Sequence, residues 1–241
     1  MSKSKFFLNN MLKALPPVFT IKNLSVLGGP RTAYRLLSEL QENKMVCKAG
    51  KGLYGKVAED PYLVAYLSHG GYIGFSSALY IQGLKTETER RIYVCSFRSG
   101  KVPFWANEFV LVNMRGFLFG TRKVVRNGQE MLASTPAKTL FDMCHRPKYS
   151  DFYCMYRALN WKPFSSSDWK ELLRYCAMAP LSTVRRVGYI VEGKAPKSIL
   201  RKLESLASDK GVSFLFKPGG EYSPKWRLYD SEYVRRWIDE A

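Results

Sequence analysis

The sequence predicts an α+β fold in two parts: a small N-terminal module of helices closed by a hairpin, and a larger mixed α/β part. Residues 18–57 carry helix-spaced apolar residues followed at once by two short strand-like runs around glycines. Beyond Gly70-Gly71 the pattern changes, and strand-like segments lead into a mostly helical last third. We therefore expect domains at residues 1–58 and 59–241, with a helical C-terminal subdomain from about residue 150.

The N-terminal module begins with a predicted helix from Lys3 to Leu15, which Pro16-Pro17 ends. Thr20 can cap a second, short helix from Ile21 to Val26, and Gly28-Gly29 make the turn that follows it. The residues of the first helix that can face the core are Phe6, Phe7, Met11, Leu12 and Leu15.

The central helix of the module is predicted from Arg31 to Asn43, with Pro30 at a position that suits a first helical turn. One face is apolar and carries Ala33, Leu36, Leu37 and Leu40. A rotation of about 100° per residue puts Arg31, Tyr34, Arg35 and Ser38 on the opposite face. Guanidinium, phenol and hydroxyl groups are suited to phosphates and base edges in a major groove.

A hairpin is predicted directly after this helix, from the runs Met45 to Lys48 and Leu53 to Val57 around a glycine-rich basic tip. Two helices followed by a basic hairpin are typical of a winged helix-turn-helix, so we expect double-stranded DNA as a partner. A winged helix that docks on protein is the alternative. The expected DNA-binding residues are Lys22, Arg31, Thr32, Tyr34, Arg35, Ser38, Lys48, Lys51 and Lys56.

The second part alternates between short strands and helices. Helices are predicted at 59–68, from Ser76 to Gly83, and after Ser134-Thr135-Pro136. Strands are predicted at 92–97, 109–113 and 122–126, with a turn or short strand at 116–120. The last third predicts helices at 151–159, 166–178, 183–191, 198–209 and 233–238, and strands at 212–217 and 226–229.

Charge and composition limit the classes to which this protein can belong. The 241 residues carry a formal net charge of +18, and residues 1–58 hold ten Lys and Arg against two Glu. Such a balance favours a polyanionic partner, nucleic acid first. No apolar run approaches the roughly 20 residues that span a bilayer, and no signal peptide is visible, so we expect a cytoplasmic protein without membrane contact. Five scattered cysteines without a CxxC pair indicate buried thiols.

Catalytic patterns in the sequence are weak. His69 and His145 are isolated from carboxylates at ligand spacing, and Cys144 adjoins His145 too closely for a local nucleophile–base pair. The Glu192-Gly193-Lys194 segment imitates part of a nuclease motif but fits a helix better. Lys138-Thr139 at a helix start could hold an anion, although an ordinary capped helix is the better explanation. We expect no cofactor, no metal and no enzyme activity.

Four stretches in order resemble the AbiEi antitoxins of type IV toxin–antitoxin systems: GLYGK at 52–56, YIGFSSALYIQGL at 72–84, ASTPAKTLFDMCHRP at 133–147 and RRVGYIVE at 185–192. The resemblance covers most of the chain. It carries over, as motif members of the antitoxin domain, Ser76, Ser77, Lys138, Thr139, Asp142, Arg186, Tyr189 and Glu192. The family gives no chemical role for each, and this sequence departs from many members in its very basic helices and its Asp142–Arg146 turn.

The resemblance implies a two-function protein. The winged helix would repress its own operon by binding operator repeats, and the C-terminal domain would counteract a cognate nucleotidyltransferase-type toxin, with or without direct contact. The alternative from another class is an enzyme, a phosphotransferase acting on the toxin. The sequence leaves open the operator, the toxin and the oligomeric state.

Overall fold

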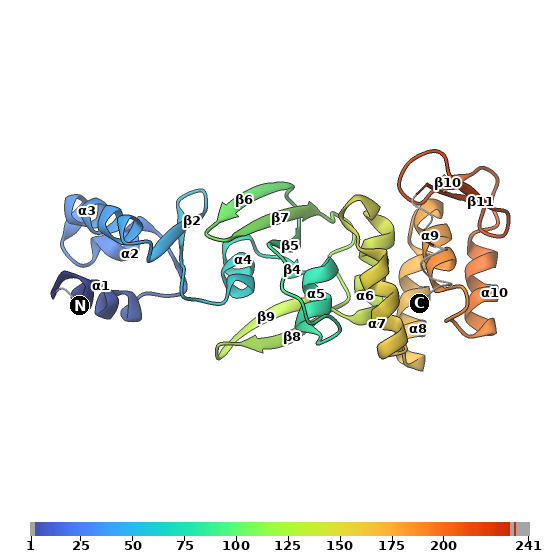
Figure 1. The fold of residues 1–241 in the computed structure, drawn as a ribbon, viewed down its shortest axis with the longest axis horizontal. Helices are drawn as coiled ribbons and strands as arrows, with labels where there is room; N and C mark the ends of the chain where they lie inside the picture. Colours follow the sequence, from blue (N-terminus) through green and yellow to red (C-terminus); the bar gives the residue numbers. More distant parts are fainter. Residues whose placement is uncertain (1–2, 232–233, 235–241) are drawn as a thin grey trace. The chain divides into compact units, whose positions relative to one another are not determined.

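The computed structural model of the chain describes residues 3–231 and residue 234 and has a mixed α+β fold. Over these residues it contains ten α-helices, one 3-10 helix and three sheets (Figure 1). None of the described helices has the length and the apolar character needed to cross a membrane. The predicted helix at 233–238 lies outside the described residues, apart from residue 234.

The chain folds into two compact units that divide it differently from the expected boundary. Unit 1 takes residues 1–73, 89–118 and 123–132, and unit 2 takes residues 74–88, 119–122 and 133–241. The first 58 residues thus share a compact unit with most of the large sheet. The chain passes between the units five times.

The three helices and the hairpin at the N-terminal end of unit 1 follow the predicted order, and a short strand (Val18–Phe19) between the first two helices was not predicted. They are α1 (Lys3–Ala14), β1 (Val18–Phe19), α2 (Ile21–Ser25), α3 (Gly29–Glu42), β2 (Val46–Gly50) and β3 (Leu53–Lys56). The strands form an antiparallel sheet in the order β1-β3-β2. The apolar face of α3 is buried as expected, in a core that also takes residues from α1, β1, α2 and β2.

The structure corrects two details of this module. Phe7 was expected in the core but is 60% exposed, while its neighbour Leu8 is 1% exposed. Of the other predicted residues, Met11 is buried and Leu12 and Leu15 pack against the core, so Leu8 is buried in place of Phe7. The hairpin is also tighter than predicted, because β2 continues to Gly50 through a register shift at Lys48/Gly50. The tip is reduced to Lys51 and Gly52, which has a φ of +69°.

The rest of unit 1 is built on a six-stranded mixed sheet in the order β6-β7-β5-β4-β9-β8. Its elements are α4 (Pro61–His69), β4 (Tyr72–Ile73), β5 (Arg91–Ser96), β6 (Gly100–Phe104), β7 (Asn107–Asn113), β8 (Thr121–Arg126) and β9 (Gln129–Ser134), the last two shared with unit 2. β5 and β7 are parallel, and β6 pairs with the outer side of β7. The strand β6 is absent from the sequence prediction, and the segment at 116–120 forms no strand.

Unit 2 is mainly helical. Its elements are α5 (Phe75–Ile81), α6 (Pro136–His145), a 3-10 turn (Pro147–Tyr149), α7 (Phe152–Trp161), α8 (Ser166–Ala177), α9 (Leu181–Val191), α10 (Lys197–Leu206), β10 (Ser213–Phe214), β11 (Glu221–Ser223) and β12 (Leu228–Asp230). The last three strands make a small sheet in the order β10-β12-β11, of which β11 was not predicted. Helix α6 contacts α5, α8 and α9.

Candidate nucleic-acid interface

Helix α3 turns a polar face to solvent. Arg31, Tyr34, Arg35 and Ser38 are exposed, and Thr32 is half-buried. The Tyr34 ring is 63% exposed. The Arg35 guanidinium forms an ion pair with Glu39 one turn later, at 3.1 Å, and the Arg35 side chain is 69% exposed. An exposed pair of this kind is worth little and can be exchanged for a phosphate or a base at small cost.

The turn before α3 adds an exposed apolar pair that the sequence prediction did not weigh. Gly28 and Gly29 close it, and Gly29 has a φ of +80°, a conformation that favours glycine. Directly before them, the side chains of Val26 and Leu27 are 86% and 54% exposed. In the sequence, the position of Val26 and Leu27 directly before two glycines was the sign that this apolar pair lies in an exposed turn. Lys22 on α2 is also exposed.

The hairpin presents Lys48 and Lys51 to solvent, and packing within unit 1 holds its base. A Cβ at Gly55 of β3 would come within 2.6 Å of Val64 Cγ1 and 2.8 Å of the Phe104 ring, so only glycine lets the strand approach α4 and β6 this closely. His69 of α4 lies next to Gly50, and burial lowers its pKa below the ordinary value, with the positive charge of Arg98 acting in the same direction.

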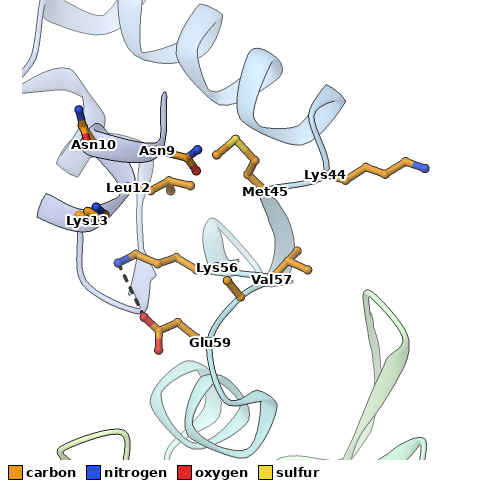
Figure 2. A pocket seen from close by; sticks show the side chains of 10 residues that line it. Asn9, Asn10, Leu12, Lys13, Lys44, Met45, Lys56, Val57 and Glu59 are labelled. Carbon is orange, nitrogen blue, oxygen red and sulfur yellow. Dashed lines mark ion pairs between the residues drawn. The ribbon is translucent and has the colours of Figure 1, made fainter. Parts of the chain in front are cut away.

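Lys56 differs from the other two hairpin lysines. Its side chain is 12% exposed, and its ammonium lies 3.9 Å from the carboxylate of Glu59. Figure 2 shows the Lys56 side chain directed toward α1, in a hollow of about 590 Å³ whose walls include Leu12, Met45 and Val57. An enclosed lysine is poorly placed for a phosphate, so the structure does not favour the predicted DNA contact of Lys56.

The antitoxin-motif residues lie mostly inside unit 2 and not at an open site. Ser76, Ser77, Lys138, Thr139, Asp142 and Tyr189 are buried, while Arg186 and Glu192 are half-buried. Their polar groups connect elements: Arg186 Nε donates to Phe214 O at 2.7 Å, and Tyr189 OH donates to Asp230 Oδ2 at 2.9 Å. Glu192 forms an ion pair with Lys225 at 2.8 Å. These residues therefore hold α6, α9 and the small sheet together.

The start of α6 is an ordinary capped helix, the interpretation that the sequence favoured over an anion site at Lys138-Thr139. Thr135 Oγ1 accepts from Lys138 N at 3.2 Å. The Lys138 side chain is fully buried and forms an ion pair with Asp142, with its ammonium about 5 Å from the ring centres of Phe119 and Phe141. Thr139 Oγ1 lies 2.7 Å from Ser134 Oγ and accepts from Gln82 Nε2 at 3.1 Å.

One buried arginine was missed from the sequence. Arg185 is 1% exposed, although only its neighbour Arg186 was chosen. Its guanidinium donates to the carbonyls of Gly211 at 2.8 Å and Ala207 at 3.3 Å, and to that of Asp209. The position of Arg185 on the inner face of the amphipathic helix was a usable signal. Beside it, a Cβ at Gly188 would lie 2.0 Å from the Trp226 ring, so α9 needs glycine there.

In unit 2, the pKa values of Cys144, His145 and Cys176 are shifted so that the neutral form of each group is favoured. Burial raises the pKa of the Cys176 thiol to about 12 and holds that of the Cys144 thiol well above its ordinary value. Burial, with the positive charges of Arg146, Lys138 and Arg186, lowers the pKa of His145 to about 4. A protonated thiol beside a neutral imidazole is a weak nucleophile. Within residues 3–231, no group of three or more His, Cys, Asp and Glu side chains is arranged to hold a metal ion.

Comparison with known proteins defines the fold of the chain and not its activity. No protein-family model matches the sequence, and no curated protein matches it either. Among solved structures, the chain is similar to the RV2827C protein from Mycobacterium tuberculosis, with a TM-score of 0.65 and 15% sequence identity. The match covers 98% of this chain and 93% of that one. The whole α+β arrangement is therefore one that an experimentally determined structure also has.

Proposed function

We propose that this protein is a DNA-binding autorepressor whose first 58 residues act as a winged helix-turn-helix. The observation that carries the proposal is the solvent-facing side of α3, where Arg31, Tyr34, Arg35 and Ser38 stand opposite a fully apolar face. The helix follows α2 across a glycine turn and precedes a hairpin with exposed Lys48 and Lys51. In such a motif the second helix enters the major groove and the hairpin contacts the backbone beside it.

The test is an electrophoretic shift of the full chain on DNA from just upstream of its own gene, against scrambled DNA at matched salt. Arg35→Ala is expected to weaken binding to the upstream DNA by roughly 1–3 kcal/mol, because a bidentate arginine–base contact is lost. The matched control is Arg201→Ala, which removes the same charge from an exposed position on α10. A fragment of residues 1–58 is less suitable, since Gly55 packs against Val64 and Phe104 outside it.

Salt dependence separates base contacts from phosphate contacts. Lys51→Ala is expected to reduce the slope of log affinity against log salt by about one, on both DNAs. Equal affinity of the wild-type chain for both DNAs, or unchanged operator affinity of Arg35→Ala, would contradict the proposal.

We further propose that unit 2 counteracts a nucleotidyltransferase-type toxin, as the resemblance to AbiEi antitoxins implies. Supporting this, motif residues make buried or half-buried polar contacts: Arg186 of α9 donates to Cys144 O of α6, Tyr189 donates to Asp230, and Lys138 pairs with Asp142 within α6. The test is growth of cells that express the toxin from the same operon, with and without this chain. Rescue without transfer of label from ATP to the toxin is expected. Label transfer would instead identify the phosphotransferase alternative.

A further inference from the structure

An aromatic and basic stripe runs along the solvent side of α7. Tyr153, Arg157 and Trp161 follow one another at intervals of four residues, so they share one face of the helix. Tyr153 is 44% exposed and Trp161 65% exposed. The guanidinium carbon of Arg157 lies 5.7 Å from the centre of the Tyr153 ring, close enough for a cation–π contact. The stripe is thus an exposed surface of two π-systems and one positive charge.

Packing of the helix does not require this stripe. The inward side of α7 is supplied by other residues, which are Phe152, Met155, Tyr156, Ala158 and Leu159. Tryptophan is highly buried on average, and a tryptophan left two-thirds exposed on a helix with a complete apolar face calls for another explanation. Exposed Trp, Tyr and Arg together are typical of recognition surfaces.

Two hollows border the stripe. One, of about 180 Å³, is lined by residues 84–87 together with Cys154, Arg157 and Trp161. A second, shallower hollow is lined by Tyr153, Arg157, Asn160 and Trp161. The charged groups on these walls are Lys85, Glu87 and Arg157, and the exposed Lys162 follows Trp161. The local balance is positive, and unit 2 as a whole holds 21 Lys and Arg against 13 Asp and Glu.

We propose that this α7 stripe binds single-stranded nucleic acid. Unpaired bases stack on the faces of Trp161 and Tyr153. Arg157, which lies between these two residues on the helix, provides a guanidinium plane and a positive charge for the phosphate that joins the two nucleotides. A duplex does not fit this chemistry, because its bases are already stacked and their faces are covered. The site is separate from the proposed operator contact on α3 and does not depend on it.

The test uses the full chain and two fluorescein-labelled probes, a 12-nucleotide oligo-U and a 12-nucleotide oligo-dT, with fluorescence anisotropy as the measurement. Trp161→Ala and Tyr153→Ala are each expected to weaken binding by roughly fivefold to a hundredfold, the effect of losing one stacked base. The control is Trp105→Ala, which removes another exposed tryptophan, 53% exposed, in unit 1. A second control, Arg201→Ala, removes a charge from an exposed position on α10 and is expected to leave oligonucleotide binding unchanged.

Tryptophan fluorescence gives an independent readout. Unlabelled oligo-U is expected to quench the wild-type emission, and this quenching is expected to disappear in Trp161→Phe but to persist in Trp105→Phe. Equal affinity of Trp161→Ala and wild type would overturn the proposal, as would a loss of binding in Arg201→Ala as large as that in Trp161→Ala. If Trp161→Ala abolishes binding of the toxin and leaves oligonucleotide binding intact, the stripe is a protein-docking surface and the proposal is wrong.

Discussion

Lys138 and Asp142 carry opposite charges at a place that solvent does not reach. Both side chains are 0% exposed, and they lie one helical turn apart on α6. Removing one member leaves an unpaired buried charge, which costs far more than the pair contributes. Lys138→Met is therefore expected to lower the free energy of unfolding by about 3–5 kcal/mol. The measurement is urea denaturation followed by circular dichroism.

The double variant Lys138→Met with Asp142→Leu is the control for this prediction. Because neither charge then remains to be buried, the double variant is expected to be more stable than Lys138→Met alone. A double variant that is as unstable as the single one would show that the ion pair is not what the site depends on.

The sequence marked Lys138, Thr139 and Asp142 only as members of a motif that resembles a family, without a physical role for each. Lys138 and Thr139 were weighed as an anion site because they begin a helix, yet burial excludes a soluble anion from Lys138. Lysine is almost never fully buried unless paired, so a prediction from composition places it at the surface. The spacing of four residues to Asp142 was the available sign of a partner. Lys138 is buried because α8 and α9 pack against α6, and no pattern within the segment itself predicts this packing.

At the scale of elements, Asp60 stabilises two of them at once. Its Oδ1 accepts from Tyr62 N at 2.8 Å and Leu63 N at 3.3 Å, which caps α4, and its Oδ2 lies 2.6 Å from Arg126 of β8. Asp60→Ala loses the cap and the ion pair, and we expect a loss of about 2–4 kcal/mol. Asp60→Asn can still cap the helix, so its loss is expected to be smaller.

Thermal unfolding of the two Asp60 variants measures the difference. Lys123→Ala serves as the control, since it breaks the ion pair with Glu130 on the neighbouring exposed strands and is expected to cause no measurable change. Equal losses for the alanine and asparagine variants would mean that the ion pair with Arg126 carries the whole effect.

Elements were predictable where the pattern of one segment decides its structure. Helix α3 is amphipathic, and its apolar positions were identified correctly because their spacing alone defines the buried face. Strand β6 was missed because Gly100, Lys101 and Pro103 look like loop residues. Proline is tolerated at the edge of a sheet, and β6 is an edge strand, a fact that only the assembled sheet order supplies.

At the scale of the whole molecule, stability is expected to fall in mild acid. The pKa of His145 is about 4 in the folded chain against 6.5 for the free side chain, so the unfolded chain takes up a proton first. The contribution of His145 is therefore complete above about pH 6.5 and is lost as the pH falls from there to about 4. With allowance for its partial exposure, this loss is roughly 1–2 kcal/mol.

Urea denaturation at pH 7 and pH 4.5 tests this expectation. In His145→Gln, which cannot be protonated, the difference between the two conditions is expected to shrink. Part of the pH dependence of stability is expected to remain in this variant, because the pKa of His69 is also lowered. If the difference in the free energy of unfolding between pH 7 and pH 4.5 is the same in His145→Gln as in the wild type, other groups cause the loss of stability in acid.

The five passages of the chain between its two units have a consequence for its ancestry. Each unit is assembled from three separate stretches of sequence, such as 1–73, 89–118 and 123–132 in unit 1. No single genetic crossover can therefore separate the two units: one before residue 74 divides unit 1, one after residue 132 divides unit 2, and one between these positions divides both. Proteins of this architecture are expected to exchange unit 1 and unit 2 rarely by recombination, and to diversify mainly by substitution, with both units inherited together.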